Sequence, residues 1–290
     1  VSSGYDSPAC GLWWWAETKG GDVRYRAKGC GDRIFCPACC VYHRDVMAQD
    51  ASRTLLGAMW GIEANRGISP KSYGLKLICT IPKITSEWIE NHPDRYDCLG
   101  SLFRAAADLS KTVWGAGVAG VMGMDFAGAS DPTAAHYHVN VYLFPAKRVG
   151  KPLSYEWDNL RTWIEHGDIG KVQEIWAAKL REYLGSEAPG IDRDKAVLHY
   201  GGIRTEQRMR FWLRYLFRSP LFDLWKGWGG RTEAGAVRYS FKGYPGGEGA
   251  PALSPTVLQF GKAAITRALD RVAEMPKKFK RIRWFGALSD

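Results

Sequence analysis

The spacing of apolar residues predicts an alternation of strands and helices from about residue 40 onward. Runs rich in β-branched and aromatic residues predict strands at 73–82, 118–126, 136–144, 197–203 and 237–244. Apolar residues three or four apart predict helices at 41–64, 96–114, 205–218 and 254–275. Residues 1–40 are predicted to form loops, and residues 146–195 to form a charged, mostly helical excursion from the sheet.

Two histidines begin the third predicted strand, and their spacing places them on one face. His136 and His138 are two residues apart, and side chains with this spacing point to the same side of a strand. The turn-forming segment 127–133 predicts a hairpin with the preceding strand, where alternation brings Asp125 to the histidine face. Gly123 would leave room there. Two imidazoles and a carboxylate suit Mn²⁺ or Mg²⁺, with zinc as an alternative.

Two other interpretations of this segment stay open. Asp131, in the linking loop, is an alternative source of the carboxylate. A lone His-x-His pattern is about equally typical of a metal site and of surface histidines at the start of a strand. The matched face on the neighbouring strand favours the metal site.

The helix predicted at 205–218 presents a tyrosine at the edge of its apolar stripe. The residues expected to be buried are Met209, Trp212, Leu213, Leu216 and Phe217. Arg208, Arg214 and Arg218 lie near Tyr215, and guanidinium groups beside a phenol are suited to meet a phosphate. An amphipathic helix with an edge tyrosine of no special role fits the same pattern.

Cysteines near the N-terminus have the spacing of zinc ligands. Cys30, Cys36 and Cys39 follow Cys10, and four thiolates arranged as a tetrahedron suit a structural Zn²⁺. Alternative ligands are Cys40 and His43, and alternative interpretations are a redox pair or buried thiols. Cys79 and Cys98 fall on a predicted strand and helix and are expected in the core.

The composition favours a polyanionic partner. Lys and Arg total 40 against 30 for Asp and Glu, which gives a net charge of +10, and there are 13 tryptophans. This combination suits a phosphate backbone with stackable bases. The C-terminal cations expected to contact DNA are Lys277, Lys278, Lys280, Arg281 and Arg283. The alternative is that this basic C-terminal end is only exposed to solvent and binds no partner.

No apolar run is long enough to cross a bilayer, and no secretory signal is found, so the sequence predicts a cytoplasmic protein without membrane partners.

Four segments together resemble motifs of the HUH endonuclease superfamily, and most resemble those of plasmid or viral rolling-circle replication initiators. The histidine motif is His136-Tyr137-His138, and the tyrosine helix is Phe211-Trp212-Leu213-Arg214-Tyr215-Leu216-Phe217-Arg218. Leu77-Ile78-Cys79-Thr80-Ile81-Pro82 is similar to the first strand motif, and Cys30–Cys39 to the cysteine motif.

The resemblance implies an α+β fold in which helices pack on a central antiparallel sheet, with a small N-terminal zinc-binding module. The domains would then be 1–66 (zinc module and helix), 67–245 (nuclease, with the insertion at 146–195) and 246–290 (helix and basic tail). A divalent ion would be held by His136, His138 and a third polar residue. Tyr215 would nick one strand of single-stranded or hairpin origin DNA, retain a 5′-phosphotyrosine bond and leave a 3′-hydroxyl for a host polymerase, with a host helicase as a further partner.

The chain departs from the family pattern at one position. Related initiators often have a glutamate four residues before the tyrosine, and related transposases a second tyrosine, whereas this chain has Phe211. Three rival functions remain: a transposase of the same superfamily, a zinc-stabilised DNA-binding protein without catalysis, and a metal-dependent hydrolase that forms no covalent adduct.

Overall fold

The structure is a computed structural model. It describes residues 13–19, 22–28, 37–63, 74–115, 118–127, 131, 133–145, 167–220, 230–231, 237–238 and 262–286. The chain divides into two compact units, each treated separately below. The larger, the sheet unit, comprises Met47–Gly128, Ala134–Phe217 and Glu274–Asp290. The other unit comprises Val1–Val46, Ala129–Thr133 and Arg218–Ala273.

A five-stranded antiparallel sheet organises the sheet unit and confirms the predicted α+β fold class. Its order is β6 (Leu198–Ile203), β3 (Gly74–Thr80), β5 (His138–Pro145), β4 (Val118–Asp125) and β9 (Ile282–Phe285). Every neighbouring pair is antiparallel. The predicted hairpin of β4 and β5 is confirmed, with Val118 opposite Pro145 and Asp125 opposite His138.

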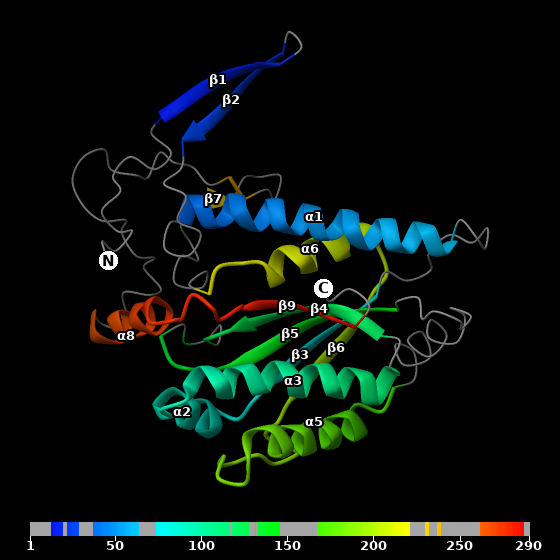
Figure 1. Ribbon diagram of the computed structural model, residues 1–290, viewed down its shortest axis with the longest axis vertical. Helices are drawn as coiled ribbons and strands as arrows, with labels where there is room; N and C mark the ends of the chain where they lie inside the picture. Colours follow the sequence, from blue (N-terminus) through cyan, green and yellow to red (C-terminus); the bar gives the residue numbers. More distant parts are fainter. Residues whose placement is uncertain are drawn as a thin grey trace. The chain divides into compact units, whose positions relative to one another are not determined.

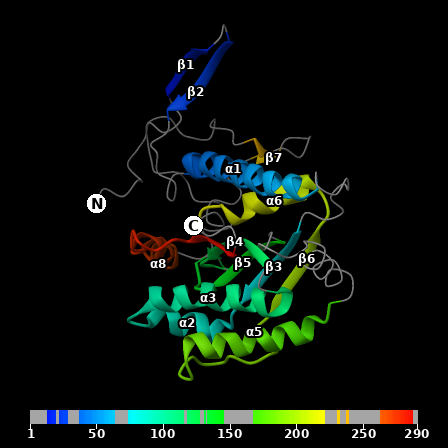
Figure 2. The same ribbon diagram turned by 45° about the vertical axis from the view of Figure 1, so that its right-hand side comes forward.

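Helices cover both faces of this sheet (Figure 1). On one side, here called the α3 face, lie α2 (Lys83–Asn91), α3 (Arg95–Trp114) and α5 (Ile169–Leu184). On the other, the α6 face, lie α6 (Glu206–Leu216) and the part of α1 (Pro37–Glu63) that belongs to the sheet unit. The turned view in Figure 2 shows α3 and α5 side by side.

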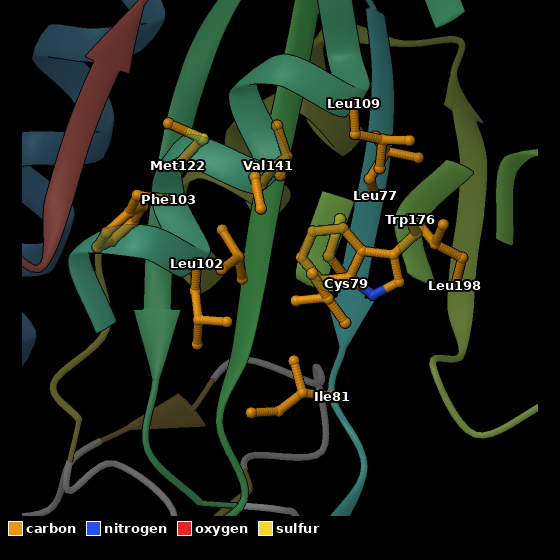
Figure 3. Packing of buried hydrophobic residues seen from close by; sticks show 14 of the residues in the cluster. Leu77, Cys79, Ile81, Leu102, Phe103, Leu109, Met122, Val141, Trp176 and Leu198 are labelled. Carbon is orange, nitrogen blue, oxygen red and sulfur yellow. The ribbon is translucent and has the colours of Figure 1, made fainter. Parts of the chain in front are cut away.

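The larger core lies on the α3 face. Alternate residues of the strands point into it, and Figure 3 shows Leu77, Cys79 and Val141 facing Leu102 of α3 and Trp176 of α5. The Trp176 indole Nε1 also donates to the Thr80 carbonyl at 3.0 Å. Helix α5, predicted as part of an excursion from the sheet, is therefore a layer of the core. The prediction that Cys79 is buried is confirmed, whereas Cys98 is half-buried.

The last strand of the sheet was predicted as a basic tail. Strand β9 pairs with β4, with Gly120 opposite Phe285 and Gly123 opposite Ile282. Phe285 is buried on the α3 face, whereas Ile282 and Trp284 pack toward the α6 face. Cations between these apolar residues hid the strand pattern in the sequence, because a period of two is weak over four residues.

The N-terminal segment also differs from the prediction of loops. Strands β1 (Trp13–Lys19) and β2 (Asp22–Lys28) form an antiparallel hairpin, with Lys19 opposite Asp22. The residues between them in the sequence are Gly20 and Gly21, and a Gly-Gly pair is one of the favoured two-residue hairpin connections. The prediction of loops did not take this hairpin signal into account.

The remaining elements belong to the unit that contains Arg218–Ala273. Strands β7 (Gly230–Arg231) and β8 (Val237–Arg238) pair with each other, and α8 spans Lys262–Ala273. Residues 239–244 of the predicted strand and 254–261 of the predicted helix lie outside the described residues. Across the described ranges, no helix combines the length and apolar character needed to cross a membrane.

A glycine in β4 tests how tightly this strand packs against its two neighbours, β5 and β9. A Cβ at Gly120 would lie 2.1 Å from the Tyr142 carbonyl oxygen and 2.8 Å from the Phe285 ring. We expect Gly120→Ala to lower the free energy of unfolding by about 2–3 kcal/mol, since overpacking distorts a dense core. Urea denaturation measures this loss.

The matched control is Gly100→Ala in α3, where the nearest atom to a Cβ is 3.9 Å away. This change should raise the free energy of unfolding by roughly 0.5–1 kcal/mol, because alanine restricts the unfolded chain and favours a helix. Equal effects of the two substitutions would contradict the tight packing of β4 against β5 and β9.

Candidate active site

A buried carboxylate lies at the end of the β4–β5 hairpin, opposite a histidine. Asp125 and His138 are cross-strand partners, and the His138 Nε2 lies 3.2 Å from the Asp125 Oδ2. The amide nitrogen of Asn140 donates to the same oxygen at 2.9 Å. Asp125 is 4% exposed and Asn140 is 1% exposed. These three residues are called the Asp125 cluster below.

The Asp125 cluster lies on the α6 face. Along β5, His138 and Asn140 alternate with Val139 and Val141, which pack in the core of the α3 face. Tyr142, the next residue in the histidine register, packs with α6. Side chains two apart on a strand share a side, so the cluster points toward the layer that carries α6.

His136 precedes the strand and stands beside the cluster. Its ring lies beside the backbone of Ile81, and the ring centroids of His136 and His138 are 5.9 Å apart. Burial lowers the pKa of His136, with a further contribution from His138. Lowering the pKa favours the neutral imidazole, which is the form that binds metal ions.

Helix α2 fixes the histidine segment through the residue between the two imidazoles. The backbone N–H of Tyr137 donates to the Ser86 hydroxyl at 3.2 Å, and the Tyr137 hydroxyl bonds to the Glu90 carboxylate. The Tyr137 ring is fully buried on the α3 face. The backbone that carries both histidines is therefore held from the opposite side of the sheet.

Helix α6 presents the predicted tyrosine at the edge of its buried stripe. Its predicted stripe is confirmed: Met209, Trp212, Leu213 and Leu216 are buried. Thr205 caps the helix by accepting from the Arg208 N–H. Tyr215 is half-buried and stacks on Trp212, with ring centroids 4.8 Å apart and an interplanar angle of 7°. The Trp212 indole donates to the Val141 carbonyl at 3.4 Å, which anchors this part of α6 to β5.

The end of α6 lies directly over β4. A Cβ at Gly123 would be 2.9 Å from the Leu216 carbonyl oxygen and 3.2 Å from the Leu216 side chain. The space beside Gly123, which was predicted to lie near an ion, is therefore occupied by Leu216. Because Gly123 is two residues from Asp125, this close approach brings the last turn of α6 near the Asp125 cluster.

Arg281 joins the end of α6 to the cluster. Its guanidinium donates to the Met124 carbonyl at 2.9 Å and to the Leu216 carbonyl at 3.5 Å, and it lies 3.8 Å from the Asp125 Oδ1. The Arg281 side chain is 11% exposed. Arg281 was predicted to be one of the DNA-binding cations of the tail, but its side chain points inward and contacts the protein itself.

The other predicted cations have varied positions. Arg208, Arg214, Lys277, Lys278 and Lys280 are exposed. Arg283 was expected to contact DNA, but its guanidinium stacks on Phe103 and donates to the Lys280 carbonyl. Arg218 is buried and belongs to the unit outside the sheet unit, so it is not placed with Tyr215.

The predicted zinc ligands are almost entirely outside the described residues. This applies to Cys10, Cys30 and Cys36. Cys39 lies in the first turn of α1, with its side chain outside the description, so the predicted zinc module stays a prediction.

The donor atoms of the site suit a divalent ion, although they do not form a closed cage. Within the described ranges, no three His, Cys, Asp or Glu side chains form a ready-made ligand group. The Asn140 Oδ1, however, is buried and has no hydrogen-bond partner among the described atoms. This oxygen lies beside a carboxylate and an imidazole. A cation bound there would give the buried oxygen the polar partner that it lacks.

The ring geometry of the histidines agrees with this fit. An imidazole nitrogen binds a metal at ~2.0–2.1 Å, so two ring centroids on one ion lie within roughly 6.5 Å of each other. The observed 5.9 Å falls within that limit. The His138 Nδ1 also lies at hydrogen-bond distance, 3.2 Å, from the His136 carbonyl oxygen. Such bonds orient metal-binding imidazoles in proteins.

Comparisons of the chain with known protein families, with curated proteins and with solved structures found no match.

Sequence reasoning placed Asn140 on the face of the two histidines, because it shares their two-residue period, but gave it no role in the site and did not foresee its bond to Asp125. The inward role of Arg281 could not be read from the sequence. Arg281 lies 156 residues after Asp125, and its role arises from the unexpected pairing of β9 with β4.

Replacing Arg281 tests its inward role. We expect Arg281→Met to lower the free energy of unfolding by about 2 kcal/mol. The substitution removes the charged donor on which two carbonyl groups and a buried carboxylate depend. Lys278→Met, in the exposed tail, should change it by less than ~0.5 kcal/mol. Chemical denaturation of both variants measures the difference. Equal stability of the two variants would contradict the inward role.

Proposed function

We propose that this protein is a metal-dependent DNA nickase and strand transferase that uses Tyr215 as its nucleophile and starts rolling-circle replication. The observation that carries the proposal is the position of two groups on one face of the sheet. The Asp125 cluster and the tyrosine-bearing end of α6 lie on the α6 face, and Arg281 contacts both of them. The excess of basic residues favours a nucleic acid as substrate.

Asp125, His136 and His138 are the residues that would hold the catalytic ion. When bound there, Mn²⁺ or Mg²⁺ would withdraw charge from the scissile phosphate and so make the phosphorus easier to attack. The buried Asp125 carboxylate supplies negative charge, and the lowered pKa of His136 favours the neutral form of its ring. Asn140 orients the carboxylate through its bond to the Oδ2.

Tyr215 would transfer the strand to itself without hydrolysis. Its phenolic oxygen forms a bond to the phosphorus, and the bond from phosphorus to the 3′-oxygen breaks. The phenol loses one proton and the leaving 3′-oxygen gains one, so protons balance. A 5′-phosphotyrosine and a free 3′-hydroxyl result, and attack by that hydroxyl reverses the step. Arg214, exposed one residue before Tyr215, would steady the phosphate.

The stacked position of Tyr215 supports this role. Its ring lies parallel to Trp212, which is itself bonded to β5. A nucleophile must be held in place for attack, and this arrangement limits the orientations available to the phenol. Half-burial leaves part of the side chain accessible to a substrate.

Covalent capture tests the proposal. The protein and Mn²⁺ are incubated with a labelled single-stranded pool, and adducts are read on denaturing gels and by sequencing the attached DNA. We expect Tyr215→Phe to abolish the adduct and to leave DNA affinity largely intact, because only the nucleophilic oxygen is lost. EDTA should abolish the adduct of the unmodified protein.

The matched control is Tyr183→Phe, which removes a half-buried tyrosine hydroxyl of α5 on the α3 face. This variant should still form the adduct. An adduct with Tyr215→Phe would remove Tyr215 from the role. Cut DNA without an adduct would indicate a hydrolase, and no cleavage with any divalent ion would indicate a DNA-binding protein without catalysis.

A further inference from the structure

The outward face of α6 carries an apolar side chain that the proposed chemistry does not use. Phe211 is 68% exposed, and among the described residues the only other large apolar side chain classed as exposed is Ile84, at 52%. Removing a phenyl ring from water is favourable, so a ring held in solvent is available to a ligand. Phe211 is not part of the stripe that packs α6 on the sheet.

The neighbours of Phe211 define the charge of this surface. Segment 204–214 contains four arginines, Arg204, Arg208, Arg210 and Arg214, and one acidic residue, Glu206, which leaves a net charge of +3. Glu206 pairs with Arg210 on one edge of the helix. Arg208 and Arg214 are three residues before and after Phe211, and both are exposed. The ring is therefore flanked by cations along the helix.

The same surface leads to the proposed nucleophile. Phe211 and Tyr215 are four residues apart, so they are neighbours on α6, separated by one turn of ~5.4 Å. A strand whose phosphate meets Tyr215 would place a flanking nucleotide over Phe211. A phenyl ring stacks on any base, and flanking guanidinium groups contact phosphates.

We propose that Phe211, flanked by Arg208 and Arg214, is a stacking platform for a base of single-stranded nucleic acid. The exposed ring and the local charge of +3 carry this inference, and it rests on the proposed function only in placing that base beside the scissile phosphate. A double helix hides its base faces, so the platform discriminates single strands from duplex.

Binding without cleavage tests the platform. Full-length protein carrying Tyr215→Phe is titrated, in EDTA, into a fluorescent mixed-sequence single strand and into the same strand annealed to its complement. We expect a further Phe211→Ala change to weaken single-strand affinity about tenfold and to leave duplex affinity unchanged, because stacking is lost. Phe211→Trp should retain single-strand affinity.

The matched control is Ile84→Ala, which removes a large apolar side chain that is exposed on α2 and should leave both affinities unchanged. Arg208→Gln should lower the salt dependence of binding by about one phosphate contact, whereas Phe211→Ala should not alter it. Circular dichroism establishes that each variant is folded.

The proposal is overturned if Phe211→Ala binds single strands as tightly as its parent, or if single-strand and duplex affinity fall equally. A specific single-strand loss supports the platform even where no covalent adduct forms. Failure of the platform therefore remains distinguishable from failure of the nicking chemistry.

Discussion

The buried carboxylate of Asp125 is the constraint on which the site depends. An isolated carboxylate transferred from water to a protein interior carries a large free-energy cost unless charged or polar groups compensate it. Here His138, Asn140 and Arg281 surround it, and they come from β5 and from the residue before β9. The hairpin, the C-terminal strand and the end of α6 are thus fixed relative to one carboxylate group.

This arrangement connects the proposed ion site with the proposed nucleophile. Arg281 contacts Asp125 with one guanidinium nitrogen and the Leu216 carbonyl with another, so one side chain touches both the Asp125 cluster and the turn that carries Tyr215. Gly123 permits the close approach, since any side chain there would displace Leu216. The precision that phosphoryl transfer requires would then come from packing on a rigid sheet.

The sequence predicted the parts of the site that depend on local periodicity. The alternation in β4 and β5 placed Asp125 opposite the histidine strand, and the apolar spacing in α6 identified its buried stripe. Strand β9 and Arg281 escaped prediction, because their roles depend on pairing with a strand more than 150 residues earlier in the chain. Gly123 was assigned to an ion because the sequence could not place α6 over it. The zinc module stays a prediction, since most of its cysteines are outside the described residues.

The most direct test of the account is the position of a bound Mn²⁺ ion, located by its anomalous scattering in crystals of the protein. The account predicts a peak within coordination distance of the Asp125 carboxylate and the His138 Nε2, with His136 as a further ligand. A fully occupied Mn²⁺ peak away from these side chains, in crystals of protein that nicks DNA, would contradict it.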